Sequence, residues 1–132
     1  MASIIEKESA NNAESYDIAA VFYNRLTNQS KYPWLNSDAT MVYAEKYYYK
    51  DELLTEEDRN NCEFNTYVYR GLIPKPIANP SLNSLAAALD PRFSEDAVYY
   101  YFVYDKEEGC HRFSETEAEH LKWIEELGLS DE

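Results

Sequence analysis

Apolar residues recur with a helical period over the first part of the chain. Ile18, Phe22 and Leu26 lie four residues apart, which predicts an amphipathic helix over residues 14–28. A shorter helix is expected over residues 1–10, because two isoleucines and several helix-forming residues precede a pair of asparagines.

The rest of the chain mixes helical segments with two short strands. Further helices are predicted where capping residues precede helix formers: residues 39–44, a segment that starts at Thr55, residues 82–89, and a last segment capped at Ser114 and ended by Gly128. Residues 64–69 have the pattern of an extended segment, and residues 71–80, with three prolines, that of an ordered loop. The β-branched and aromatic run 98–104 predicts a buried strand that pairs with residues 110–113 as a hairpin. We therefore expect an α+β fold, with several short helices packed around a small antiparallel sheet or hairpin.

Length and charge narrow the function. A chain of 132 residues fits one domain, and 12 basic against 25 acidic residues give a net charge of −13. That charge argues against a nucleic-acid partner, whose backbone binds clustered Lys and Arg. Cys62 and Cys110 lie far apart, and with His111 and His120 they do not have the spacing of a metal site, so neither a metal nor a cofactor is expected. No apolar run is long enough to span a bilayer, and we expect the chain as given to be soluble.

Two carboxylates in the first helix are candidates for acid–base chemistry. Glu6 and Glu8 directly follow Ile4 and Ile5. A carboxyl group pressed against apolar surface has a raised pKa, and such a Glu can act as a general acid near neutral pH. Periodicity places Glu8 nearer the centre of the apolar stripe and Glu6 at its edge. Ordinary solvated glutamates on an amphipathic helix would give the same pattern, so the residues alone leave the choice open.

Tyrosine is unusually frequent, with 13 in the chain. A tyrosine ring offers a flat apolar face and a polar tip, which suits stacking on sugars. It suits the core of a strand equally well, and for residues 99–104 the strand interpretation is preferred.

Several segments in this order resemble one family, the YceG/MltG-like endolytic murein transglycosylases. The segments that carry the resemblance are SIIEKES (3–9), DIAAVFYNRL (17–26), LNSDATMVYA (35–44), FNTYVYRGLIPKPIANPSLNSLAAALDP (64–91), YYFVYD (100–105) and GCHRFSETEAEH (109–120). The resemblance is collinear and covers nearly the whole chain. It implies that residues 1–132 form a single α+β catalytic domain, without the membrane anchor and LysM-like domain of the family.

The resemblance also implies a reaction and its residues. It implies cleavage of the MurNAc–GlcNAc bond inside peptidoglycan glycan strands, with a 1,6-anhydro ring left on MurNAc, and it places the catalytic glutamate on Glu6. Candidate substrate-binding positions are carried over one by one: Asn36, Ser37, Asp38, Asn65, Tyr67, Asn79, Pro80, His111 and Phe113. Each has a structural alternative, since Asp38 could be a helix cap, Asn65 could close a turn, Pro80 could start a helix, and His111 could be a hydrogen-bonded strand residue.

The sequence departs from the family pattern at a few positions. Ala39 replaces a proline, Ala44 and Cys110 each replace a glycine, and Lys75 stands where the family has a glycine in its proline-rich loop. A catalytically weak peptidoglycan-binding or scaffold module of the same fold is therefore the alternative function. A pyridoxal-phosphate lyase is a third class, but the chain has no Gly-rich anion-binding loop for that cofactor.

The resemblance finally implies partners and a location. Glycan strands of peptidoglycan are the expected substrate, and cell-wall synthesis enzymes such as penicillin-binding proteins are a further candidate partner. If the chain is part of a longer anchored protein, it is expected on the extracytoplasmic face of the bacterial membrane.

Overall fold

The computed structural model describes residues 1–50 and 52–129, and within them it shows an α+β fold, as expected. The elements are α1 (Ala2–Glu8), α2 (Ser15–Leu26), α3 (Asp38–Tyr47), α4 (Glu56–Asn60), α5 (Leu82–Leu89), β1 (Tyr101–Asp105), β2 (Cys110–Ser114) and α6 (Glu117–Glu126). No helix within the described ranges has the length and apolar character needed to cross a membrane.

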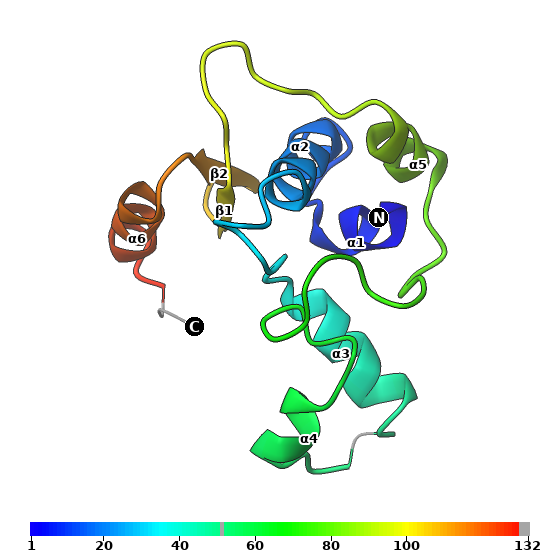
Figure 1. Ribbon diagram of the computed structural model, residues 1–132. Helices are drawn as coiled ribbons and strands as arrows, with labels where there is room; N and C mark the ends of the chain where they lie inside the picture. Colours follow the sequence, from blue (N-terminus) through cyan, green and yellow to red (C-terminus); the bar gives the residue numbers. More distant parts are fainter. Residues whose placement is uncertain (51, 130–132) are drawn as a thin grey trace.

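The hydrophobic core lies between the helices rather than on the sheet. Helices α1, α2 and α5 form one group, with α3 running away from α1 toward α4 (Figure 1). Ile4 and Ile5 of α1 are fully buried against Ile18 and Phe22 of α2. Burial of one such side chain contributes about 1.5–3 kcal/mol. The predicted apolar faces of the first two helices are therefore confirmed as the centre of the core.

The hairpin joins this core along one face and carries α6 on the other. Strands β1 and β2 pair antiparallel, with Phe102 opposite Phe113 and Tyr104 opposite His111. Phe102 meets Phe22 of α2 edge-on, with ring centroids 5.7 Å apart. The alternate residues face α6, where Tyr101 stacks on His120. Figure 1 shows the hairpin between α2 and α6, at the end of a long loop that arches over from α5.

Arg25 ties the hairpin and a distant loop to α2. Its side chain is buried, with Nε donating to the carbonyl of Tyr100 at 2.6 Å and Nη1 donating to the carbonyl of Trp34 at 2.8 Å. The guanidinium also lies over the rings of Tyr32 and Tyr101. Because burial disfavours the charged form, the pKa of Arg25 is lowered. Across the described part of the chain, no carboxylate forms a salt bridge with Arg25.

Residues 64–69, expected to be extended, form consecutive turns instead. The amides of Val68 and Tyr69 both donate to the carbonyl of Asn65, and the side-chain oxygen of Asn65 accepts from the amide of Tyr67. An asparagine that bonds its own backbone two residues on competes with extended structure, and here that local bond prevails over the β-favouring aromatic residues around it.

The carboxy-terminal elements differ from the prediction in two further places. The strand begins at Tyr101 and not at Val98, whose side chain is 49% exposed, because β2 ends at Ser114 and offers no partner further on. The cap of the last helix is Thr116, which accepts from the amide of Glu119, whereas the predicted cap Ser114 is buried in β2.

Other helix boundaries and caps agree with the sequence prediction. Helix α5 has the predicted bounds, α4 begins with the capping box of Thr55 and Asp58, and Gly128 ends α6 with a positive φ of 67°. Helix α3 runs to Tyr47, three residues beyond the predicted end.

We expect Arg25→Leu to destabilise the fold strongly. The change leaves the carbonyls of Tyr100 and Trp34 buried without their donor, and each such group costs about 1–3 kcal/mol, so the free energy of unfolding should fall by about 2–4 kcal/mol. Urea denaturation followed by circular dichroism measures this value.

Arg70→Leu is the matched control, because Arg70 is exposed. It should change the free energy of unfolding by less than about 0.5 kcal/mol. Equal losses in the two variants would show that the bonds of Arg25 add nothing beyond general solvation of an arginine.

Candidate active site

Glu8 is a mostly buried carboxylate at the end of α1, directed at the start of α3. Its Oε1 accepts a hydrogen bond of 2.6 Å from the hydroxyl of Ser37. Burial raises the pKa of Glu8, and the negative charge of Asp38 adds to the rise. The Ser37 hydroxyl, the charge of His111 and the backbone N–H of Ala39 act in the opposite direction, but burial outweighs them. A carboxyl group in this setting retains its proton to higher pH than a solvated glutamate.

Ser37 is free to bond Glu8 because backbone interactions fix it by other means. It is the N-cap of α3, yet its side chain makes no capping bond. Its amide donates to Thr66 Oγ1 at 2.9 Å, and its carbonyl accepts from the hydroxyls of Thr40 at 2.9 Å and Thr66 at 3.0 Å. Asn36, just before it, has a positive φ of 55°, a backbone conformation that Asn tolerates better than most residues. The Ser37 hydroxyl is thereby positioned in advance.

Asp38 and Tyr67 extend this cluster toward the surface. The hydroxyl of Tyr67 donates to Asp38 Oδ1 at 2.7 Å. Burial and the neighbouring carboxylate of Asp38 raise the pKa of Tyr67, so the phenol stays protonated and acts as a donor. Glu8, Ser37, Asp38 and Tyr67 therefore form a connected polar group built from three segments of the chain.

Glu6 lies elsewhere, at the amino-terminal end of α5. Its Oε1 accepts a hydrogen bond of 2.6 Å from the amide of Ser81, the N-cap residue of α5. The backbone and side-chain hydrogen bonds of Ser81 lower the pKa of Glu6. The hydrogen bond to Ser37 is made by Glu8 and not by Glu6. The environment of Glu6 favours a carboxylate that is ionised at neutral pH.

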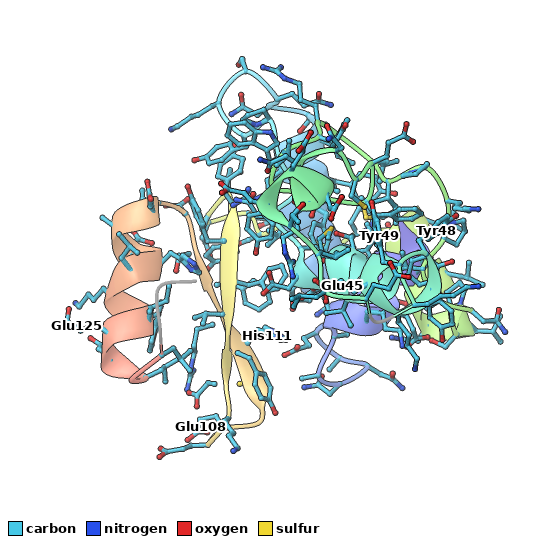
Figure 2. The ribbon with its side chains drawn as sticks, turned by 90° about the horizontal axis from the view of Figure 1, so that it is seen from below. Glu45, Tyr48, Tyr49, Glu108, His111 and Glu125 are labelled. Carbon is cyan, nitrogen blue, oxygen red and sulfur yellow. The ribbon has the colours of Figure 1, made fainter. Side chains whose placement is uncertain are left out.

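His111 is held by Glu14, a residue that the sequence did not single out. Both side chains are buried, with 7% and 8% of their surface exposed, and His111 Nδ1 bonds Glu14 Oε2. The amides of His111 and Ala10 also donate to the Glu14 carboxylate, at 2.9 and 3.0 Å. Burial raises the pKa of Glu14, but these hydrogen bonds outweigh it and the net shift is downward. Figure 2 shows His111 on the side of the hairpin that faces the helices, opposite to the side of Glu125 on α6.

The remaining predicted site residues have different surroundings. Asn65 donates to the carbonyl of Arg59 at 2.9 Å and closes a turn. Phe113 packs against the core beside Phe102, Asn79 and Asn36 are exposed, and Pro80 is half-buried directly before α5. The structure therefore groups Ser37, Asp38 and Tyr67 with Glu8, whereas their roles in binding substrate, and those of the other positions, stay predictions.

Several residues that position the candidate site were not identified from the sequence. Glu14, Thr40 and Thr66 position the site through contacts that are long-range or made by the backbone, and no local sequence pattern marks such contacts. Lys75, at the position of a family glycine, is not among the residues with positive φ, so this loop does not need a glycine there.

The surface pocket and the candidate metal ligands were compared with the positions of Glu6 and Glu8. An open pocket of about 510 Å³ lies beside β2 and is lined by His111, Phe113, Arg92 and Trp123 among others, but not by Glu6 or Glu8. No group of three or more His, Cys, Asp or Glu within residues 1–50 and 52–129 could hold a metal ion. The group with the features of a proton donor is the Glu8–Ser37 pair.

Comparison with known proteins gives consistent matches. A model of the YceG-like family matches residues 1–126. An endolytic murein transglycosylase of Bacillus subtilis is 40% identical over 122 residues, which are 92% of this chain and 32% of that protein. One of Streptococcus pneumoniae is 31% identical over 130 residues, 96% of this chain and 22% of that protein. This chain therefore spans about a third or less of the length of these relatives.

A solved structure has the same fold. The crystal structure of a yceG-like protein from Listeria monocytogenes superposes with a TM-score of 0.71 and 40% identity, over 92% of this chain and 36% of that one. The match of the family model over nearly the whole sequence, together with these relatives, shows that the chain belongs to the YceG-like family.

Proposed function

We propose that this chain is the catalytic domain of an endolytic murein transglycosylase, which cleaves MurNAc–GlcNAc bonds within peptidoglycan glycan strands. The names of two relatives that match over most of this chain support the reaction. The single observation that carries the proposal is the carboxyl group of Glu8, which is partly buried, has a raised pKa and is oriented by Ser37.

The reaction needs one carboxyl group that first gives and then takes a proton. Protonated Glu8 donates its proton to the glycosidic oxygen, O4 of GlcNAc, as the bond from C1 of MurNAc to that oxygen breaks. The C6 hydroxyl of the same MurNAc attacks C1, and the Glu8 carboxylate accepts the proton from O6. A 1,6-anhydro ring results and no water enters. Because the attacking hydroxyl is tethered to the sugar, much of its entropic cost is removed beforehand.

The surroundings of Glu8 suit both its role as proton donor and its later role as proton acceptor. Burial raises the pKa of Glu8 and thereby favours the protonated form, which is the form that a general acid needs. The Ser37 hydroxyl and the N–H of Ala39 stabilise the carboxylate that forms next. Asp38, next to Glu8, supplies negative charge that would stabilise an oxocarbenium-like centre at C1.

The resemblance assigned the catalytic role to Glu6, and that assignment stays a prediction. The geometry favours Glu8. The hydrogen bonds from Ser81 lower the pKa of Glu6 and fix its side chain at the start of α5. In our proposal Glu6 stabilises the start of α5, where a negative charge interacts favourably with the helix dipole.

The proposal also covers the further domains of the whole protein and its location in the cell. Relatives that are about three times longer or more leave room for further domains, which we propose include a membrane anchor and a LysM-like domain. The catalytic domain would then act at the extracytoplasmic face of the bacterial membrane, beside cell-wall synthesis enzymes such as penicillin-binding proteins.

Two isosteric variants of helix α1 test the identity of the proton donor. Glu8→Gln removes the proton donor and should lower the rate roughly 10²- to 10⁴-fold, whereas Glu6→Gln should keep most of the activity. The assay digests purified glycan strands with the chain and counts anhydro-MurNAc ends by mass spectrometry.

The outcomes separate three possibilities. Loss of activity in Glu6→Gln alone would return the role to Glu6. A wild-type chain that binds strands but forms no anhydro ends would support the binding-module alternative.

The second prediction concerns the pH dependence of the reaction. The acid form of Glu8 exists below its pKa, so kcat/KM should decline as pH rises through that raised pKa. Because the Ser37 hydroxyl lowers the pKa of Glu8, Ser37→Ala should raise that pKa further and move the declining limb to higher pH.

Ser84→Ala is the control for the Ser37→Ala variant. Ser84 is buried at the start of α5, near Glu6 and away from the Glu8–Ser37 pair, so Ser84→Ala should leave the position of the limb unchanged. If the decline of kcat/KM shifted to lower pH in Ser37→Ala, the result would contradict the proposed hydrogen bond to the Glu8 carboxylate.

A further inference from the structure

Trp34 is an exposed aromatic residue whose ring is nevertheless fixed. Its side chain is 41% exposed, and its Nε1 donates to the carbonyl of Val68 at 3.0 Å. Its own carbonyl accepts from Arg25. The indole edge and the backbone are therefore both held, which leaves the apolar surface of the ring as the part open to a ligand. A rigid aromatic side chain loses little conformational entropy when it binds, which is why Trp and Tyr dominate many binding surfaces.

A continuous set of contacts joins Trp34 to the proposed acid. The loop that contains Trp34 leads directly to Ser37, the partner of Glu8. This loop runs beside the turns at 64–69, where the amide of Asn36 donates to the carbonyl of Thr66 at 3.1 Å. Tyr67, adjacent to Val68, is 42% exposed and bonds Asp38. Trp34 and Tyr67 thus present two fixed, partly exposed aromatic rings beside the Glu8 cluster.

The chemistry of this surface fits a neutral sugar ring. The C–H face of a pyranose packs on an aromatic ring, and the acceptor oxygens of Asp38 next to it can bind hydroxyl or amide donors. The charged members of this cluster are the carboxylates of Glu8 and Asp38, and the guanidinium of Arg25 nearby is buried and bonded to backbone carbonyls. Together with the chain's net charge of −13, this argues against stacking of a ring that carries a carboxylate, such as MurNAc without its stem peptide, and favours the neutral GlcNAc ring on Trp34.

We propose that Trp34 forms a sugar-binding subsite, on which a ring of the glycan strand next to the cleaved bond stacks. This inference rests on the proposed function and names a residue that positions the strand rather than one that takes part in proton transfer. Trp34 would set the register in which a long strand passes Glu8.

The first test uses the indole itself as reporter. The chain has two tryptophans, so Trp123→Phe leaves Trp34 as the sole tryptophan signal. Combined with Glu8→Gln to prevent turnover, this variant is titrated with purified glycan strands that lack stem peptides. We expect a saturable change in the emission of Trp34.

The second test measures what the ring contributes. Trp34→Ala should weaken strand binding roughly tenfold, which corresponds to about 1.4 kcal/mol. It should also raise KM with little change in kcat, because stacking at a distance from the reacting bond stabilises the ground state and the transition state alike. Trp34→Phe should recover most of the affinity, since it keeps an aromatic face.

A matched control and the contrary outcomes complete the design. Phe93 is an aromatic residue with 55% exposure outside the Glu8 cluster, and Phe93→Ala should bind and cleave strands as the wild type does. Unchanged strand affinity in Trp34→Ala, while the wild type still forms anhydro ends, would overturn the subsite and leave the proposed function standing. Binding with no anhydro ends in the wild type, lost in Trp34→Ala, would support the subsite and refute the transglycosylase reaction. No binding of strands to any variant would refute both.

Discussion

A buried guanidinium, which has no carboxylate partner among the described residues, joins the hairpin and the loop before α3 to helix α2. Arg25 bonds the carbonyl just before β1 and the carbonyl of the loop before α3, so one side chain of α2 fixes both the hairpin and the loop. A planar group with several donors in fixed and separated directions suits this role better than the single ammonium nitrogen of a lysine. The loop held in this way carries Trp34, and three residues later Ser37. The orientation of the proposed acid thus depends on a residue that does not touch it.

The two glutamates of α1 show how strongly position on a helix decides chemistry. Residues two apart lie about 200° from each other around the axis, so Glu6 and Glu8 face nearly opposite sides. One side meets the amide at the start of α5, which stabilises the ionised carboxylate. The other side meets a partly buried surface, where the loss of solvent raises the pKa of Glu8 although the Ser37 hydroxyl bonds its carboxylate. Identical residue types on one short helix therefore acquire opposite shifts in pKa.

The fold could be predicted from sequence wherever a local signal decides the structure. Helix α5 follows from its serine cap and alanine-rich run, and the hairpin follows from its aromatic strand and glycine turn. The turns at 64–69 were missed because the side chain of Asn65 bonds its own backbone against the β preference of its neighbours. In the site, periodicity alone placed Glu8 nearer the apolar stripe, in agreement with the loss of solvent that raises its pKa. The contact between Glu14 and His111 could not be predicted, since it depends on how distant segments meet.

That contact has a consequence for how the protein matures. Glu14 and His111 are 97 residues apart along the chain, and the pair joins the start of α2 to the last strand. Contacts of such high sequence separation are costly to form early in folding, because a long loop must close first. During synthesis the helices α1, α2 and α3 leave the ribosome long before β2 does. Because the charge of His111 acts on Glu8, the electrostatic surroundings of Glu8 are completed only when the carboxy-terminal hairpin docks.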